Sequence, residues 1–311
     1  MRDQIGCALL QLAGSGLKFF VVDADNGRAT RVNAFGETYP SWYVNVGCAE
    51  QNLVGVSAGL SLTGVPVVAA TFSVFLLGRA YDQIRNSISA SNLRVVLLGT
   101  HAGLSTGADG GTHCCPEDLA LMRALPRVQV LVPAHYEDLT PMLKFALESP
   151  GPSYIRVPRE ELWEDRSEPA PIITFSSVGL RCWRTGTELA FVCAGLLLPR
   201  VLAVADALIN DGWSIAVFDL PLLNIDANLV LTKLSAFRAV ITVEDHWPAG
   251  GISEMIAAIL SGVGDLPVHG INAAHRHPSS GPLNEVLDDM GLSIQRIMSI
   301  AEDTLRQPDL T

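Results

Sequence analysis

Basic side chains are scarce in this 311-residue chain, which has 21 lysines and arginines against 32 aspartates and glutamates and a formal net charge of -11. An acidic balance has the wrong sign for a protein that binds nucleic acid or anionic lipid through its charge. The composition therefore favours small molecules or another protein as partners, and it argues against nucleic acid and membrane surfaces.

Paired cysteine motifs are also lacking, because the six cysteines occur without paired spacing. The spacing indicates neither a disulfide framework nor a zinc ribbon. The start of the chain, MRDQIGCALLQL, carries an acid within its first three residues and has no signal-peptide core. We therefore expect a cytoplasmic protein with reduced cysteines.

Charged side chains and histidine are missing from every position between residues 51 and 78. A membrane span would produce such a run. Gly64, Val65 and Pro66 interrupt it, and a turn there leaves a helix of about a dozen residues and a strand, VPVVAATF, each too short to cross hydrocarbon. We expect no membrane span.

Short apolar runs alternate with helical patterns along the whole chain, from KFFVVDAD near the start to LPVHGINA near the end. This rhythm predicts an α/β protein in which mainly parallel sheets are flanked by helices. A charged, proline-bearing stretch, EELWEDRSEPAP, interrupts it. We therefore predict a first domain over residues 1–160, a linker over 161–186 and a second domain over 187–311.

Glu50 is a single acid at the head of the uncharged run, and it begins the predicted helix that follows VGCA. It could simply favour the positive end of the helix dipole. At an apolar junction it could also share a proton with a ligand. Gly55 and Gly59 give this helix a smooth face that would suit another subunit.

Two aromatic residues, Phe72 and Phe75, follow in the segment TFSVF at the end of a predicted strand. Ligands of open parallel sheets gather beyond the carboxyl ends of the strands. The two rings could be core residues, or they could pack against a flat heteroaromatic ring whose polar edge faces Glu50.

A glycine-rich segment, THAGLSTGADGGTH, carries His101, Asp109 and His113. Small residues allow the backbone to approach a ligand, and two imidazoles and an acid could bind a hydroxylated substrate. A flexible loop is the alternative. A metal site at HCC, residues 113 to 115, is disfavoured because contiguous ligands cannot wrap one ion.

Arginines and histidines elsewhere allow both structural and functional interpretations. Arg156 and Arg159, in YIRVPR, could grip a phosphate or carboxylate at a strand end, or could be ordinary surface arginines. The second-domain segments EDHWPAGGISE and AAHRHPSSG contain His246, His275 and His277, which we interpret as solvated loops.

These segments together resemble the second half of the transketolases, and in particular the short chains of split, two-subunit transketolase-like enzymes. The resemblance runs through DADNGR, VGCAEQN, TFSVF, GRAYDQIRNSI, GTHAGLSTGADGGTH, EDLALMRALP, YIRVPR and TVEDHWPAGG, so it covers nearly the whole chain. It implies a pyrimidine-binding domain followed by a transketolase C-terminal domain. It also implies transfer of a two-carbon ketol unit from a ketose or related donor to an aldehyde acceptor.

The resemblance implies thiamine diphosphate as cofactor and gives each candidate residue a role. Glu50 would bond to the pyrimidine ring nitrogen, and Phe72 and Phe75 would pack against that ring. His101 and His113 would lie beside the hydroxyls of the donor, with His113 catalytic together with Glu50. Asp109 would bind an acceptor hydroxyl. The resemblance also places Arg159 on the distal anion of the substrate.

Gly-Asp-Gly, which in this family marks the domain that binds the diphosphate through Mg²⁺, does not occur in the chain. We therefore expect a separate N-terminal subunit to supply the diphosphate and Mg²⁺ site. The resemblance implies a heterotetramer of two long and two short chains.

Several positions depart from the family pattern on the substrate side. Cys48 stands where many relatives have an aliphatic residue, Ala108 replaces a frequent acid, and Cys114, Cys115 and Pro116 replace a QAL-like stretch. The Ala108 version is similar to deoxyxylulose-phosphate synthase. These changes leave the donor and the acceptor open, and a specialised pathway is conceivable.

Two other interpretations compete with this one. The beta subunit of a 2-oxoacid decarboxylase or acyloin-type enzyme shares the two-domain plan and the need for a partner, but it lacks a GADGGTH-type loop. A non-catalytic scaffold subunit is the second alternative, although a scaffold would not need Glu50, Phe72, His101, Asp109 and His113 together.

Overall fold

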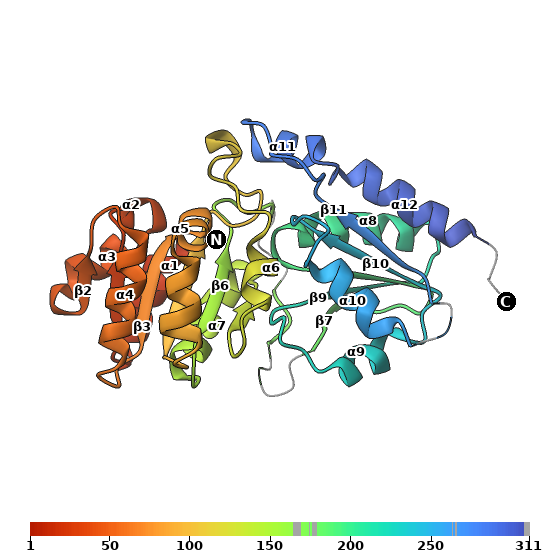
Figure 1. The fold of residues 1–311 in the computed structure, drawn as a ribbon. Helices are drawn as coiled ribbons and strands as arrows, with labels where there is room; N and C mark the ends of the chain where they lie inside the picture. Colours follow the sequence, from red (N-terminus) through yellow and green to blue (C-terminus); the bar gives the residue numbers. More distant parts are fainter. Residues whose placement is uncertain (164–168, 174, 176–178, 263, 265, 308–311) are drawn as a thin grey trace.

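The computed structural model describes residues 1–163, 169–173, 175, 179–262, 264 and 266–307. Within these ranges the chain forms two α/β halves that lie side by side, with the first at the left and the second at the right of Figure 1. Each half is built around its own sheet. The fold class predicted from the sequence is confirmed.

The first sheet has six strands in the order β2-β1-β3-β4-β6-β5, all of them parallel. Its strands are β1 (Phe20–Asp23), β2 (Tyr43–Asn45), β3 (Val67–Phe72), β4 (Val95–Thr100), β5 (Gln129–Leu131) and β6 (Ser153–Val157). Its helices are α1 (Gln4–Gly14), α2 (Gly27–Thr30), α3 (Asn33–Thr38), α4 (Glu50–Ser61), α5 (Ser73–Gln83), α6 (Asp118–Arg123) and α7 (Leu139–Glu148).

The second sheet has five strands in the order β11-β10-β8-β9-β7, and β7 is antiparallel to its neighbour. Its strands are β7 (Arg181–Arg184), β8 (Leu189–Cys193), β9 (Ile215–Asp219), β10 (Ala239–Glu244) and β11 (Val268–Asn272). Its helices are α8 (Leu198–Asn210), α9 (Ala227–Leu234), α10 (Ile252–Leu260), α11 (Leu283–Asp289) and α12 (Ile294–Arg306). Strand β7 lies inside the range predicted as linker, 161–186, part of which is outside the described residues.

The central strands are buried at every position, which explains their uninterrupted apolar sequences. A parallel sheet that carries helices on both faces has no solvated side. One continuous apolar core joins α4, α5 and α6 of the first half to α9 and α10 of the second. The two halves therefore share part of their interior.

The uncharged run folds as predicted into a helix, α4, a turn with Gly64 at φ +87°, and strand β3. Its last part differs from the expectation, because the strand ends at Phe72 and Phe75 lies in the first turn of α5. Among the described residues, none of the helices is both long and apolar enough to cross a membrane.

Candidate active site

Glu50 is the first residue of α4, and its side chain is only 5% exposed. It is not the isolated acid that the sequence suggests. Arg79 of α5 donates hydrogen bonds from Nη1 to both carboxylate oxygens, at 3.0 and 3.1 Å. The buried acid therefore faces a cation whose own side chain is 55% exposed.

The rings of Phe72 and Phe75 stack next to this pair, with centroids 5.4 Å apart and planes 12° from parallel. The Arg79 guanidinium lies over the Phe75 ring, 4.2 Å from its centroid. Through Arg79, the Glu50 carboxylate and the two aromatic faces thus belong to one patch.

His101 follows β4 directly and has a left-handed backbone, with φ +55°. A non-glycine residue in this region is uncommon and is often found at functional sites. The imidazole stacks on Phe72 at 3.6 Å between centroids, and its Nδ1 lies 3.0 Å from Thr100 Oγ1. Burial lowers the pKa of His101 to about 3, with the nearby guanidiniums of Arg2 and Arg159 contributing. His101 is therefore neutral near pH 7.

His113 comes from the other end of the glycine loop, which we define as residues 103–113. Its ring meets Phe75 edge-on at 5.3 Å and Phe72 at 6.3 Å. Its Nδ1 lies 2.9 Å from Thr112 Oγ1. The fold therefore gathers Phe72, Phe75, His101 and His113 in one aromatic cluster beyond the carboxyl ends of β3 and β4.

Asp109 lies in a 3₁₀ turn of the glycine loop and forms an ion pair with Arg159 Nη1 at 2.7 Å. The same nitrogen donates to the Thr106 carbonyl at 2.8 Å, and the backbone N–H of Arg159 donates to Ser105 Oγ at 2.9 Å. Asp109 and Arg159 therefore act as a pair at the rim of the cluster.

Arg2 is a residue that the sequence analysis did not select. Its Nε is buried without a hydrogen-bond partner in the described part of the chain. Burial lowers the pKa of Arg2, and the nearby guanidiniums of Arg31 and Arg159 add to this effect. The Nε lies 3.7 Å from Asp3 Oδ1, so Arg2 is a second cation near Arg159 and has only this long ion pair at its Nε. Its position near the start of the sequence, far from the motifs, gave no signal of this role.

Arg156 is not available to a ligand. Its side chain is 3% exposed and donates to Asp118 of α6 at 2.8 Å and to Asp245 of the second half at 2.6 Å. Tyr154 donates to the same Asp118 and to Ser73 Oγ, each at 2.9 Å. Of the two arginines in YIRVPR, only Arg159 lies at the candidate site.

The two cysteines of the HCC segment are structural. Cys114 lies 2.8 Å from Thr106 Oγ1, Cys115 is buried, and burial raises the pKa of both thiols. Within the described ranges, His, Cys, Asp and Glu side chains form no group of three or more that could hold a metal ion. His246 is buried, contrary to the expectation of a solvated loop, and accepts from the Ala120 N–H at 3.2 Å.

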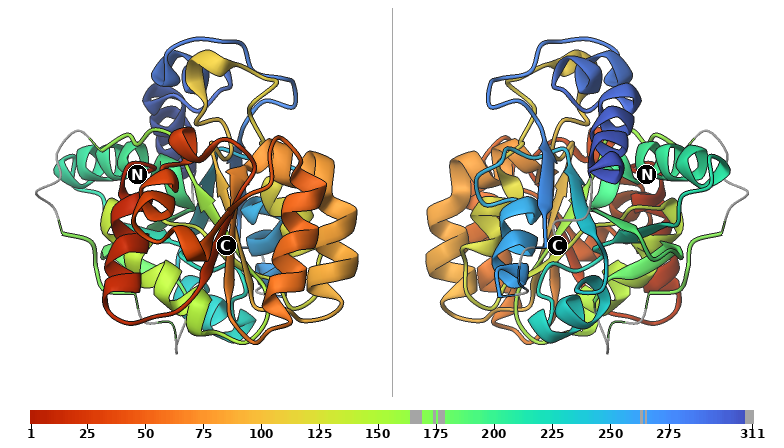
Figure 2. Two further views of the ribbon diagram at one scale, coloured as in Figure 1. Left: turned by 90° about the vertical axis from the view of Figure 1, so that its left-hand side faces the viewer. Right: turned by 90° about the vertical axis from the view of Figure 1, so that its right-hand side faces the viewer.

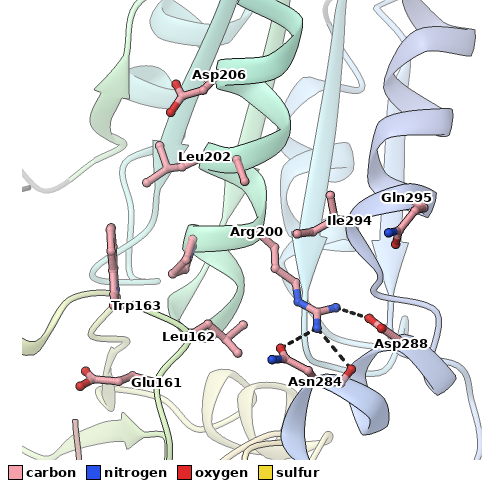
Figure 3. A pocket seen from close by; sticks show the side chains of 12 residues that line it. Glu161, Leu162, Trp163, Arg200, Leu202, Asp206, Asn284, Asp288, Ile294 and Gln295 are labelled. Atoms are coloured by element: carbon pink, nitrogen blue, oxygen red, sulfur yellow. Dashed lines mark hydrogen bonds and ion pairs between the residues drawn. The ribbon is translucent and has the colours of Figure 1, made fainter. Parts of the chain in front are cut away.

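A cavity of about 610 Å³ lies elsewhere, among α8, α11 and α12 (Figure 3). Arg200 at its edge donates to Asp288 at 2.6 Å, to Asn284 Oδ1 at 2.8 Å and to the Leu292 carbonyl at 2.7 Å. This guanidinium is committed to holding α8 against α11. None of the predicted site residues lines the cavity.

The sequence matches two family descriptions in order. Residues 1–163 match "Transketolase, pyrimidine binding domain", and residues 180–297 match "Transketolase, C-terminal domain". The chain belongs to the transketolase family.

Individual relatives place the chain in the second half of that family. It is 32% identical over 303 residues to "Putative transketolase C-terminal section" from Methanocaldococcus jannaschii, covering 96% of this chain and 93% of that protein. It is 28% identical over 248 residues to one of the subunits of an apulose-4-phosphate transketolase from Actinobacillus succinogenes, covering 79% of each. It spans about half the length of other relatives. The match to "Transketolase-like protein 1" from Bos taurus has 33% identity and covers 98% of this chain and 51% of that protein.

A solved structure, described as "Split gene transketolase, inactive beta4 tetramer", has the same fold. The TM-score is 0.87 at 34% identity, and the match covers 98% of this chain and 97% of that one. The chain thus corresponds to the C-terminal section of the transketolases, as the sequence motifs predict.

Proposed function

We propose that this chain is the short subunit of a transketolase-like transferase. It would move a two-carbon ketol unit from a ketose or related donor to an aldehyde acceptor, together with a separate N-terminal subunit. The observation that carries the proposal is the patch in which the buried acid Glu50 lies beside the stacked rings of Phe72 and Phe75, with His101 and His113 around them. We also propose that residues 1–160 form the pyrimidine-binding domain and residues 187–311 the C-terminal domain.

Membership of this family implies dependence on thiamine diphosphate, and the residues present fit its pyrimidine ring. A flat ring needs an aromatic wall, which Phe72 and Phe75 provide, and a hydrogen-bond acceptor at its edge, which Glu50 provides. When bound, the cofactor supplies the carbanion-stabilising chemistry that breaking and remaking a carbon–carbon bond requires.

The side chains of this chain would bind, orient and exchange protons. Glu50 would share a proton with the pyrimidine ring nitrogen through the buried carboxylate that Arg79 holds in place. His101 is neutral near pH 7, so it can bind a donor hydroxyl without carrying charge. His113 would bind a donor hydroxyl and move protons there.

Asp109, Arg159 and Arg2, at the edge of the aromatic cluster, would bind the acceptor and the distal end of the substrate. Asp109 offers carboxylate oxygens to an acceptor hydroxyl, and Arg159 offers donors to an anionic group. Arg2 adds a partly buried guanidinium whose Nε has no hydrogen bond and only a 3.7 Å ion pair with Asp3, so we propose that it joins Arg159 in binding an anion.

The partner subunit would hold the diphosphate and Mg²⁺, because the Gly-Asp-Gly that marks this site in the family does not occur in this sequence. The related split gene transketolase supports the need for this partner, because its beta4 tetramer is inactive. We propose a heterotetramer of two long and two short chains. The six free cysteines fit a reducing compartment, and we propose the cytoplasm.

Calorimetry tests this proposal directly. Thiamine diphosphate and Mg²⁺ are titrated into this chain alone, and then into this chain mixed with a candidate partner, a Gly-Asp-Gly protein of roughly 270 residues. Binding only in the mixture is expected. Tight binding to the lone chain would contradict the split site, and no binding in either sample would favour the scaffold alternative.

Product analysis then separates the two enzymatic alternatives. Cleavage of a ketose with transfer to an aldehyde supports the transketolase-like reaction. Release of carbon dioxide from a 2-oxoacid would instead support the decarboxylase or acyloin-type alternative.

A further inference from the structure

We propose that residues 277–281 of the second domain position the glycine loop, and through it Asp109, for binding of the acceptor. This inference rests on the function proposed above. It gives the second domain, which contributes none of the predicted site residues, a defined part in the reaction. In Figures 1 and 2 the loop (yellow) and the second-domain segment (blue) lie against each other at the top of the molecule in every view.

Three glycines of the loop pack directly against this segment. Gly107 accepts a hydrogen bond from the Gly281 N–H at 3.4 Å, and a Cβ at Gly107 would lie 3.2 Å from the Gly281 carbonyl oxygen. A Cβ at Gly110 would overlap Ser280 Oγ. A Cβ at Gly111 would lie 2.8 Å from the Pro278 carbonyl oxygen. A side chain at Gly111 would clash with backbone, one at Gly107 would be tight, and one at Gly110 would displace the Ser280 hydroxyl. Packing therefore favours glycine at all three positions, and the backbone conformation favours it at Gly107 and Gly110.

The backbone of the loop also requires support, because two of the three glycines have a left-handed conformation. The φ angles are +59° at Gly107 and +73° at Gly110. Glycine has high backbone conformational entropy in the unfolded chain, so a glycine-rich loop keeps one conformation only where contacts with neighbouring residues fix it. The segment 277–281 supports the loop in this way, because it contacts Gly107, Gly110 and Gly111.

The loop and its flank are tied to the second domain as well. The Leu104 N–H donates to Asp245 Oδ2 at 3.2 Å, and the Trp247 N–H donates to the Pro116 carbonyl at 2.8 Å. Asp245 and Trp247 follow strand β10. The loop is therefore anchored to the second domain before Gly107, at Gly107 to Gly111, and after His113.

Asp109 is the proposed functional residue that a change in this packing would affect most directly. It directly precedes Gly110, which contacts Ser280, and its carboxylate pairs with Arg159. By contrast, Glu50 and Phe75 contact Arg79, and Phe72 contacts His101, all within the first domain. The His113 N–H donates to the Gly110 carbonyl at 3.0 Å, so His113 would move with the loop. A displaced loop should therefore impair the acceptor step through Asp109 and the donor step to a smaller extent through His113, and it should spare the cofactor patch.

The test compares Ser280→Val with Ser280→Ala in the assembled two-subunit enzyme. The valine adds a second γ atom against Gly110, whereas the alanine removes Oγ and adds nothing. Because a shift of about 1 Å in a positioned group can cost about a hundredfold in rate, we expect Ser280→Val to raise the KM for an aldopentose phosphate acceptor roughly tenfold or more. Ser280→Ala should stay within about twofold, as should the exposed control Glu285→Gln.

Two further readouts distinguish positioning from general damage. The Kd for thiamine diphosphate should be unchanged in Ser280→Val, and release of aldehyde from a ketopentose phosphate donor in the absence of acceptor should fall by less than the acceptor step. An unchanged acceptor KM, or an equal loss in the donor step, would overturn the inference.

Hydrogen–deuterium exchange gives a readout that needs no activity. Ser280→Val should speed amide exchange at residues 107–113 and leave residues 50–75 as in the unmodified chain. If the unmodified enzyme cleaves none of a panel of ketose donors, the proposed function fails, and the exchange result still decides whether this segment holds the loop.

Discussion

Replacement of Glu50 by glutamine should remove most of the activity and leave the fold intact. The ion pair with Arg79 spans 3.0 Å, but the Arg79 side chain is 55% exposed, so water can solvate the guanidinium once the acid is gone. Ion pairs with such exposure contribute about 0–1 kcal/mol to stability. We therefore expect the variant to lose less than about 1 kcal/mol of unfolding free energy.

The effect on turnover should be much larger. A positioned proton-exchanging group contributes a factor of about 10² to 10⁴. At about 1.4 kcal/mol for each tenfold change, the barrier to reaction should rise by about 3–5 kcal/mol. Glu50→Gln preserves the shape of the side chain, and Glu50→Ala should give a loss in the same range.

Steady-state turnover of the assembled enzyme and urea denaturation of this chain measure the two effects separately. The exposed residue Glu37, replaced by glutamine, is the matched control and should behave as the unmodified protein. Activity of Glu50→Gln within about tenfold of the unmodified enzyme would refute the reasoning, because the predicted proton exchange would then be dispensable.

Three further predictions concern stability, protonation and reactivity. Arg156→Leu leaves two buried carboxylates without their cation and should cost about 3–5 kcal/mol in urea denaturation, whereas the exposed control Arg306→Ala should not shift the midpoint. His101 should stay neutral in NMR titrations of the folded chain down to about pH 4, and a ring that titrates near 6.5 would contradict its burial. Because the folded pKa of about 3 lies below the usual 6.5, the free energy of unfolding should fall as the pH is lowered from 6.5 to about 3. Cys7 and Cys48 are exposed and should be alkylated rapidly in the isolated chain, whereas the buried cysteines should react only on unfolding, and equal rates would contradict the packing.

Much of the fold could be predicted because the buried strands have distinctive sequences. RVVLLG and PVVAATF are apolar without alternation, as strands covered on both faces must be, and both form central strands of the first sheet. Glu50 could be selected because it stands at the head of a long uncharged run, but the helix dipole alone could explain it, and its proposed role came from the family resemblance. These are local signals that a single sequence carries.

The remaining parts of the site depend on contacts between distant residues, which a single sequence does not display. Arg79 is 29 positions from Glu50 in the chain and reaches it only because α4 and α5 pack together. Arg2 reaches the rim only through the fold. The segment AAHRHPSSG was interpreted as a solvated loop, yet Pro278 and Ser280 pack against glycines more than 160 positions away.

The buried arginine between the two domains also determines how the chain could be divided. Arg156 lies on β6, while its two acids lie on α6 and after β10, so neither domain alone contains the complete charged group. Either half expressed separately would expose apolar surface and leave buried charge unpaired. Two polypeptides produced by a break in the predicted linker should therefore be unstable alone and should reassemble when mixed, as obligate fragments of one unit.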